Sequence, residues 1–277
     1  MRVALLVAIA ACGDDLHLAS GDATLMVSFG GLDRIVIVHA PALRLPHAPL
    51  VLSLHGSGGI AAGQQAAVAL DPLADQDGFI TAYPQAAIPY GGGFEWHVPG
   101  VPLNQGPEPP DAPDDVGYVA AAIDAIDRQF HVDRSRIFAS GFSGGARMTS
   151  SLGCDLPEIV AIAPMSGVRY PAPCAARPLT VIAFHGSADP TNPYDGNGAA
   201  FWTYSVPDAM AGWAAQEGCA ASPEVTTVAP DVQLASYPSC AHDATVALYL
   251  SIGEGHQLPV GIDANQTMWL AFSDVVR

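Results

Sequence analysis

The chain contains no lysine, and all ten of its basic residues are arginines. Its 27 acidic residues give a formal charge of −17 over 277 residues. A surface with so little positive charge repels phosphate backbones, so we expect no nucleic-acid partner. The excess of acidic groups is expected to keep the protein soluble and monomeric rather than to recognise a cationic ligand.

Long hydrophobic runs are also missing, since no apolar run reaches the ~18–20 residues that span a bilayer. A shorter apolar run at residues 3–11 ends at Cys12, and its length suits an export signal. The string Ile9-Ala10-Ala11-Cys12 resembles a bacterial lipobox, in which the cysteine is lipidated. We predict that residues 1–21 are an export signal and linker, that the protein is secreted, periplasmic or on the cell surface, and that membrane attachment occurs only through Cys12. An ordinary signal peptide or a buried strand is the alternative.

Metal-binding patterns are absent, because there is no CxxC or HExxH and the nine histidines are scattered. We therefore expect neither a metal nor a cofactor. Four cysteines besides Cys12 allow three pairings. In an oxidising compartment we favour the two short loops, Cys154–Cys174 and Cys219–Cys240, each stabilising the fold by roughly 3 kcal/mol.

What is present is an alternation of strand and helix patterns. Two β-branched runs flank Gly30-Gly31 and predict an antiparallel hairpin. Residues 50–55 are a continuous apolar run, as in a strand buried on both faces. From there strands alternate with helices, which predicts an α/β fold with a mostly parallel sheet and helices on both faces, in a single domain over residues 22–277. The expected elements are helices at 61–76, 115–130, 144–154, 207–218 and 264–272, and strands at 79–83, 136–140, 159–163, 179–185 and 245–251.

The first candidate for chemistry is a GxSxG motif centred on Ser143. A predicted strand leads into it and a predicted helix leads out. A serine on such a sharp turn presents its hydroxyl above the edge of the sheet, and the helix directs its N-terminal amides at any oxyanion. Ser143 is therefore our candidate nucleophile.

Two further candidates follow later strands. Asp189 comes after the strand at 179–185, and His256 lies in a glycine-rich loop after the strand at 245–251. His256 would accept the proton of Ser143, and Asp189 would orient the imidazole and stabilise its charged form. The order serine, aspartate, histidine, each after a strand, is that of the α/β-hydrolases. Asp114 and Asp115 precede a predicted helix and are expected to cap it.

A glycine-rich stretch, LHGSGG at residues 54–59, follows an early strand. In the α/β-hydrolase fold this loop supplies one oxyanion-hole amide, and the residue after the nucleophile supplies the other. We assign these amides to Ser57 and Gly144.

The same stretch supports a different hypothesis. Residues 56–61 fit GxGxxA, a dinucleotide-binding pattern, and Asp75 lies about 20 residues further on. Against it, the pattern normally follows the first strand of a sheet, and Asp75 falls inside a predicted helix. A nucleotide-binding oxidoreductase and a catalytically inactive hydrolase-fold binding protein are the alternatives.

A family resemblance extends from about residue 22 to the C-terminus. The strings that carry it, in order, are LHGSGG, LADQDGFITAYPQ, PDDVGYVAAAID, VDRSRIFASGFSGGARMTSSLGC, IAPMSG, AFHGSADPTNPYDG, WAAQEGC and GEGHQLP. With them the chain resembles the secreted polyhydroxybutyrate depolymerase-like and feruloyl-esterase group of α/β-hydrolases.

The resemblance implies Ser143 as nucleophile, Asp189 as triad acid and His256 as base, in a serine esterase that acts through an acyl-enzyme. Where the family has tryptophan two residues after the histidine, this chain has Leu258. We expect polyhydroxybutyrate-type oligomers, feruloyl esters or related polyesters as substrates. Aromatic rings in the surrounding loops are expected to contact them: Trp96, Tyr194 and Trp202, with Tyr204 beside them.

Overall fold

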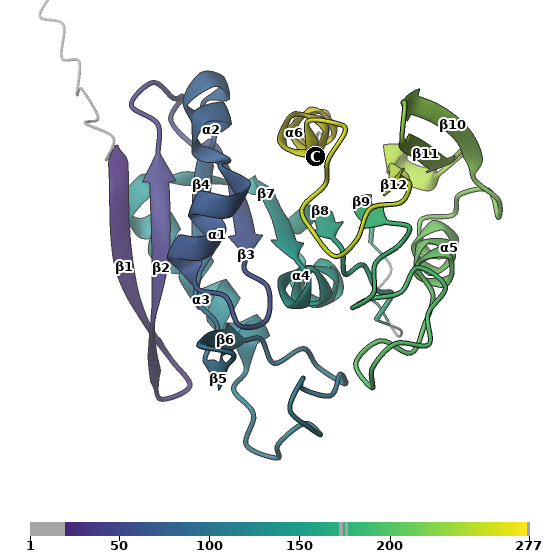
Figure 1. Ribbon diagram of the computed structural model, residues 1–277. Helices are drawn as coiled ribbons and strands as arrows, with labels where there is room; N and C mark the ends of the chain where they lie inside the picture. Colours follow the sequence, from purple (N-terminus) through teal and green to yellow (C-terminus); the bar gives the residue numbers. More distant parts are fainter. Residues whose placement is uncertain (1–19, 172–173, 175–176, 276–277) are drawn as a thin grey trace, which may run out of the picture.

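The structure is a computed structural model, and it describes residues 20–171, 174 and 177–275 (Figure 1). Most of the predicted export segment, including Cys12, lies outside these residues. The strands are β1 (Gly21–Phe29), β2 (Leu32–Ala40), β3 (Ala48–Leu54), β4 (Ile80–Pro84), β5 (Ile88–Tyr90), β6 (Gly93–Glu95), β7 (Val132–Phe142), β8 (Ile159–Met165), β9 (Thr180–Gly186), β10 (Glu224–Ala229), β11 (Val232–Tyr237) and β12 (Val246–Ser251). The helices are α1 (Ala61–Val68), α2 (Asp71–Asp77), α3 (Asp115–Phe130), α4 (Gly144–Asp155), α5 (Val206–Gln216) and α6 (Ala264–Ser273).

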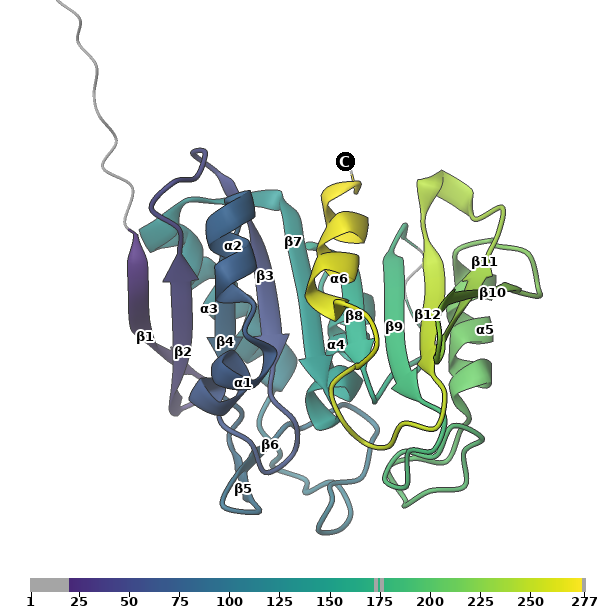
Figure 2. The same cartoon turned by 45° about the horizontal axis from the view of Figure 1, so that its top comes forward.

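Ten of these strands form one sheet, in the order β1-β2-β4-β3-β7-β8-β9-β12-β11-β10. The six central strands, from β4 to β12, are parallel, and antiparallel strands complete both edges. Figure 2 shows the carboxyl ends of β3, β7, β8, β9 and β12 pointing to the same edge of the sheet. The α/β-hydrolase fold predicted from the sequence is confirmed.

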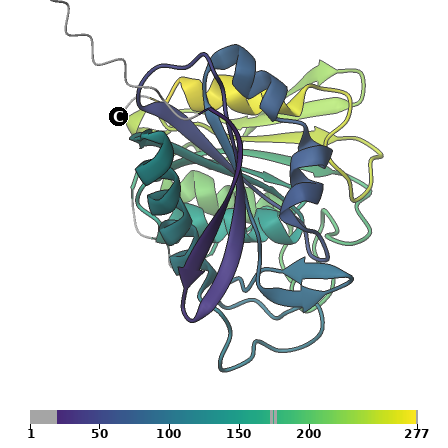
Figure 3. The same ribbon diagram turned by 90° about the vertical axis from the view of Figure 1, so that its left-hand side faces the viewer.

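Side chains of β3 show why the sheet is covered on both faces. Leu50, Leu52 and Leu54 belong to a core under α3, α4 and α5, whereas Val51 belongs to a second core under α1, α2 and α6. Alternate residues of a strand point to opposite faces, so an unbroken apolar run requires two covered faces. Figure 3 shows these two helical layers on either side of the sheet.

The predicted N-terminal hairpin is formed by β1 and β2. Phe29 pairs directly with Leu32, so Gly30 and Gly31 are the whole turn, with φ of 58° and 79°. Two successive residues with positive φ define the turn that matches the twist of the strands, and glycine adopts this conformation without steric cost.

Two local predictions differ from the structure. The helix expected at residues 61–76 is two helices, because Ala69 takes a left-handed conformation (φ 46°) and Pro72 lies in the first turn of α2. Proline has no amide hydrogen and ends a preceding helical turn, so this break was readable from the sequence. The antiparallel pair β10 and β11 was not predicted; its outer strand β10 is exposed and lacks a clear apolar alternation.

The two aspartates at the start of α3 have different roles. Asp114 caps the helix by accepting a hydrogen bond from the amide of Gly117, 2.8 Å away. Asp115 does not cap it; its buried carboxylate pairs with Arg34 of β2 and accepts the amide hydrogen of His97. The capping expectation was therefore wrong for Asp115, whose ion pair joins the N-terminal hairpin to α3.

Both favoured disulfides are present, Cys154–Cys174 and Cys219–Cys240. The first joins the end of α4 to the segment before β9, and the second joins the end of α5 to the segment before β12. No helix in the described ranges combines the length and the apolar character needed to cross a bilayer.

Candidate active site

Ser143 occupies the turn between β7 and α4 in a backbone conformation that non-glycine residues rarely adopt, with φ 54° and ψ −115°. Its amide donates to the carbonyl of Met165 at 2.9 Å, which ties the turn to β8. The glycines of the motif are required by close backbone approach: a Cβ on Gly145 would lie 2.2 Å from the carbonyl oxygen of Leu54. The strained turn is thus maintained by packing that only glycine allows.

His256 lies at the carboxyl edge of the sheet on the segment between β12 and α6. Figure 2 shows this segment turning back beneath the ends of β8 and β9. Its Nε2 is 2.8 Å from Oγ of Ser143, and its Nδ1 is 2.7 Å from Oδ2 of Asp189. The structure therefore brings together three side chains separated by 113 and 67 positions in the sequence.

Asp189 is buried and surrounded by hydrogen-bond donors. Its second oxygen, Oδ1, accepts the amides of Thr191 and Asn192, each at 2.8 Å. Burial alone would raise the pKa of Asp189, but the hydrogen bonds from His256 and these amides lower it below its ordinary value. The carboxylate thus stays ionised and acts as the acceptor for Nδ1–H of His256.

A second histidine, His185, lies beside the same carboxylate, with Nε2 3.7 Å from Oδ2 of Asp189. Its Nε2–H donates instead to the carbonyl of Asn192 at 2.8 Å. Burial lowers the pKa of His185, so this ring remains neutral and does not compete for the charge of Asp189.

The amides of Ser57 and Gly144 lie next to each other beside Ser143. A Cβ on Gly144 would be 3.1 Å from the nitrogen of Ser57 and 2.3 Å from its Oγ. A Cβ on Gly56 would be 3.3 Å from Cβ of Ser143. Within the described part of the chain, neither the Ser57 nor the Gly144 amide has a hydrogen-bond acceptor. Both N–H groups are therefore available to an oxygen bound above Ser143.

His55 supports this loop from below. Its Nδ1–H donates to the carbonyl of Gly56 at 2.8 Å, and its Nε2 accepts the amide of Ala86 at 3.1 Å. Burial lowers the pKa of His55 to about 4. The indole N–H of Trp96 donates to the carbonyl of His55 at 2.8 Å, so Trp96 also supports the loop.

Two polar residues that the sequence did not indicate complete the support. Nδ2 of Asn104 donates to Oγ of Ser57 at 2.9 Å. Asn104 is in turn bound by the buried carboxylate of Glu95, which accepts the Asn104 amide at 3.0 Å as well as its Nδ2. Glu95 is at the end of β6, and Asn104 lies in the proline-rich loop that follows. A carboxylate and an amide in a long loop give no sequence signal of this kind.

The aromatic residues expected to contact substrate are differently placed. Trp202 is fully buried, and its indole donates to the carbonyl of Pro193 at 2.9 Å. Trp96 is 3% exposed. The expectation that these two rings line an open crevice is wrong, because both pack within loops. Tyr194 is partly buried, with its ring centre 6.3 Å from that of His185, and Tyr204 lies beside Trp202.

The dinucleotide-binding hypothesis fails on the same loop. The amide of Gly58 donates to the carbonyl of Phe94 at 2.9 Å, and the amide of Phe94 donates to Gly59 at 3.0 Å. A pyrophosphate would need these glycines to be uncovered. Asp75, the expected ribose ligand, instead contacts His39 from within α2.

One group of possible metal ligands occurs among the described residues, formed by Asp22, His39 and Asp71. Both ring nitrogens of His39 are engaged, by Asp22 at 2.7 Å and Asp75 at 3.1 Å. Asp71 accepts the hydroxyl hydrogens of Thr81 and Tyr83. These hydrogen bonds connect β1 and α2 to β2 and β4, and their residues are distant from Ser143 in the sequence.

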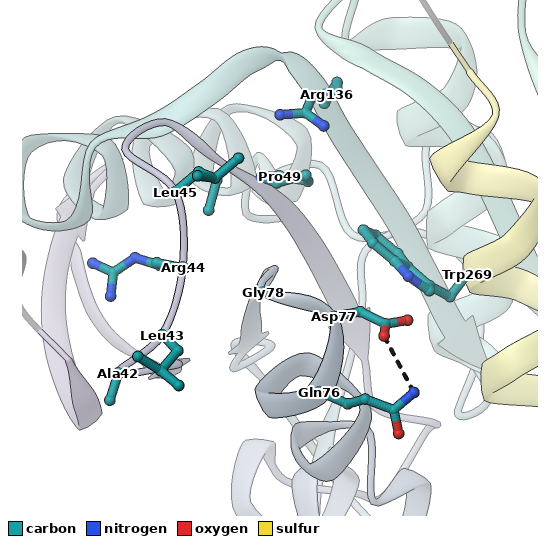
Figure 4. A pocket seen from close by; sticks show the side chains of 11 residues that line it. Ala42, Leu43, Arg44, Leu45, Pro49, Gln76, Asp77, Gly78, Arg136 and Trp269 are labelled. Carbon is teal, nitrogen blue, oxygen red and sulfur yellow. Dashed lines mark hydrogen bonds between the residues drawn. The ribbon is translucent and has the colours of Figure 1, made fainter.

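A cavity of about 500 Å³ lies at the opposite end of the sheet, where β3 begins (Figure 4). Leu43, Leu45 and Pro49 line it together with Trp269 of α6. Its polar side chains include Gln76 and Asp77, which bond to each other at 3.2 Å. Since the triad residues follow the carboxyl ends of their strands, this cavity is remote from Ser143.

Comparison with known proteins finds that the chain is similar to several esterases. It is 31% identical over 161 residues to a bifunctional acetylxylan esterase/xylanase of Neocallimastix patriciarum, covering 57% of this chain and 22% of that protein. It is 28% identical over 223 residues to feruloyl esterase B of Piromyces equi, covering 76% and 39%. A poly(3-hydroxyalkanoate) depolymerase of Paucimonas lemoignei is 29% identical over 136 residues, covering 48% and 31%. The chain is a relative of these esterases.

The resemblance expected from the motifs is thus confirmed, although the chain spans less than half the length of each of these curated relatives. No protein-family model matches it. Among solved structures, an acetyl xylan esterase from Aspergillus awamori superposes with a TM-score of 0.67 at 18% identity, covering 91% of this chain and 99% of that one. At this identity the similarity establishes the fold.

Proposed function

We propose that the protein is a carboxylic ester hydrolase of the serine type. The observation that carries the proposal is the position of His256, whose two ring nitrogens lie within hydrogen-bond distance of Ser143 and Asp189. The esterase relatives support the same reaction class. No step of this reaction needs a metal or a redox group.

In the first half of the reaction, Oγ of Ser143 attacks the ester carbonyl while its proton moves to Nε2 of His256. Asp189 stabilises the imidazolium that forms. The carbonyl oxygen becomes an oxyanion and accepts hydrogen bonds from the amides of Ser57 and Gly144. His256 then protonates the leaving alcohol, and Ser143 carries the acyl group as an ester.

In the second half, His256 takes a proton from water, which attacks the acyl carbonyl. The tetrahedral oxyanion is held by the same two amides, and collapse returns the proton to Ser143 and releases the acid. Since the base must be neutral at both steps, the rate is expected to fall as the solution is acidified.

The names of the relatives suggest the substrate range: acetylated or feruloylated plant polysaccharides and poly(3-hydroxyalkanoates). We propose small or oligomeric esters of these classes. A panel of 4-nitrophenyl butyrate, methyl ferulate and a hydroxybutyrate trimer, compared by kcat/KM, would rank them.

The test of the reaction class is Ser143→Ala, a variant that removes only the hydroxyl. We expect kcat to fall by several orders of magnitude with the circular dichroism spectrum unchanged. The matched control is Ser135→Ala, an exposed serine on β7 whose hydroxyl bonds to Asp133. A wild-type chain without activity on the whole panel would favour the inactive binding protein instead.

We further propose that the protein functions outside the cytoplasm. The two disulfides support an oxidising compartment. Lipidation at Cys12 predicts that Cys12→Ser moves the protein from the membrane fraction to the soluble fraction of the producing cell. A membrane-bound Cys12→Ser chain would contradict it.

A further inference from the structure

Arg147 is buried close to Ser143, and no carboxylate among the described residues forms an ion pair with it. It lies one helical turn after Ser143 in α4, and its amide donates to the carbonyl of Ser143 at 3.1 Å. The side chain is 4% exposed; its guanidinium is 4.5 Å from the ring centre of Phe201, and its Nη1 is 3.4 Å from Oδ1 of Asn192. Its Nε has no partner among the described residues. Burial lowers the pKa of Arg147 to about 10, so the group stays charged at neutral pH.

Arg169 approaches the same region from the segment after β8. This segment lies against the nucleophile turn, since a Cβ on Gly167 would be 2.4 Å from the carbonyl oxygen of Ser143. Nη1 of Arg169 is 3.4 Å from the carbonyl oxygen of Pro99, and its Nε is buried without a partner in the described structure.

The hydroxyl of Tyr204 is the third member of this cluster and is likewise buried without a partner in the residues described. Tyr204 lies three positions after Phe201, whose ring is 4.5 Å from the Arg147 guanidinium, and its own ring centre is 4.5 Å from that of Trp202. Burial raises the pKa of Tyr204, and both guanidinium groups oppose that rise. The hydroxyl therefore remains protonated and can donate a hydrogen bond. We call Arg147, Arg169 and Tyr204 the cationic cluster.

The lack of ion pairs is unexpected in a chain with 27 acidic residues and ten arginines. Arg34, Arg134 and Arg136 each pair with a carboxylate. Glu95 and Asp155 influence the cationic cluster electrostatically, yet the described structure contains no ion pair between them and Arg147 or Arg169. A buried cation without a counter-charge is costly, and a carboxylate bound by arginine removes that cost.

The segments that carry Arg147 and Arg169 both contact the turn of Ser143. The loop after β6, which contains Pro99, and the loop after β9, which contains Phe201 and Tyr204, lie on the two sides of α4 (Figure 1). The backbones of Ser143 and Arg147 are about 6 Å apart, one turn of helix. A substrate group within a few bonds of the ester could therefore reach the cluster.

We propose that Arg147, Arg169 and Tyr204 bind a carboxylate carried by the substrate, so that the enzyme prefers esters whose acid or alcohol part bears a second, ionised carboxyl group. This inference rests on the proposed ester hydrolase function. Half-esters of short dicarboxylic acids and oligomers of hydroxy acids with a free carboxyl end have this chemistry.

The experiment compares two esters of equal length on the full chain, mono-4-nitrophenyl glutarate, which is an anion, and 4-nitrophenyl pentanoate, which is neutral. We expect kcat/KM to favour the anionic ester at least tenfold. Arg147→Gln, Arg169→Gln and Tyr204→Phe should each bring this ratio toward one. Arg136→Gln, which removes a partly exposed arginine in the first half of β7, should leave this ratio unchanged. A wild-type ratio near one, or a ratio that persists in all three variants, would overturn the inference while the ester hydrolase proposal stands.

A binding measurement tests the site without turnover and without relying on the most buried variant. The Tm of the Ser143→Ala chain, which should not hydrolyse either compound, should rise with monomethyl glutarate but not with neutral dimethyl glutarate. Arg169→Gln, whose side chain is partly exposed, and Tyr204→Phe, which keeps the ring, should abolish the rise. Equal shifts with both compounds would contradict the carboxylate site. Absence of hydrolysis of both esters would instead count against the proposed function.

Discussion

Gly145 lies so close to Leu54 that a Cβ at position 145 would be 2.2 Å from the carbonyl oxygen of that residue. The contact joins the end of β3, which leads into the loop carrying Ser57, to the first turn of α4, which follows Ser143. The spacing between Ser143 and the amide of Ser57 therefore depends on the absence of a side chain at position 145.

Substitution Gly145→Ala should push these two segments apart. We expect kcat/KM for a neutral ester to fall at least ~100-fold, because displaced donors lose their hold on the oxyanion. Gly63→Ala in α1 is the control, since its Cβ would meet only Ile60 at an ordinary 3.5 Å. Equal activity of both variants, measured with folding checked by circular dichroism, would show that the contact does not set the site.

Asn104→Ala should lower kcat about tenfold and change KM less than twofold. Without the hydrogen bond to its Oγ, Ser57 loses the contact that fixes its position, and only the transition state uses its amide fully. In Glu95→Gln the amide oxygen of the glutamine can still accept hydrogen bonds from both the backbone amide and Nδ2 of Asn104, so this variant should retain most of the activity.

The control for this pair is Gln105→Ala, whose side chain contacts Pro89 and Glu95 but not Ser57. A rise in KM with kcat preserved in Asn104→Ala would assign Asn104 to substrate binding instead of loop positioning.

His55 should make the fold sensitive to acid. Its pKa is about 4 in the folded chain against an ordinary 6.5, so the unfolded chain binds the proton first. The contribution of neutral His55 to the free energy of unfolding is complete above pH 6.5 and is lost as the pH falls toward 4. At pH 5 the free energy of unfolding is lower by about 2 kcal/mol. Burial of His185 acts in the same direction.

Urea unfolding at pH 7, 6 and 5 measures this effect. His55→Gln can still accept the amide of Ala86 but does not titrate, so its free energy of unfolding should depend less on pH than that of the wild type. Parallel pH profiles for the two chains would contradict the assignment.

The ion pair between Arg34 and Asp115 should contribute more to the free energy of unfolding than the pair between Arg134 and Asp124. Both partners are buried, so Asp115→Asn leaves an unpaired cation and should lower the free energy of unfolding by about 3–5 kcal/mol. Asp124→Asn breaks an exposed pair with Arg134 and should cost about 1 kcal/mol or less. Similar losses in both variants would contradict this reasoning.

How far the sequence predicts the structure depends on the range of the interaction. The apolar run of β3, the glycines at 30 and 31 and the strand–serine–helix turn are local patterns with one favourable geometry each, and all were predictable. The order of the three triad residues along the chain also indicated one edge of the sheet.

The parts that could not be predicted depend on contacts between distant segments. Asp115 looks like a helix cap because its long-range partner Arg34 is 81 positions away. Trp96 and Trp202 look like surface rings in loops, yet both loops fold over them. The hydrogen bond from Asn104 to Ser57 joins residues 47 positions apart in irregular segments, where periodicity carries no information.

The most direct test of the central claim is to label the nucleophile. The full chain is treated with a fluorophosphonate, and tryptic peptides are analysed by mass spectrometry. We predict one modified residue, Ser143, with loss of ester hydrolysis in proportion to labelling, and no modification in Ser143→Ala. Stoichiometric labelling of another residue, or full ester hydrolysis by the Ser143→Ala chain, would contradict the proposed mechanism.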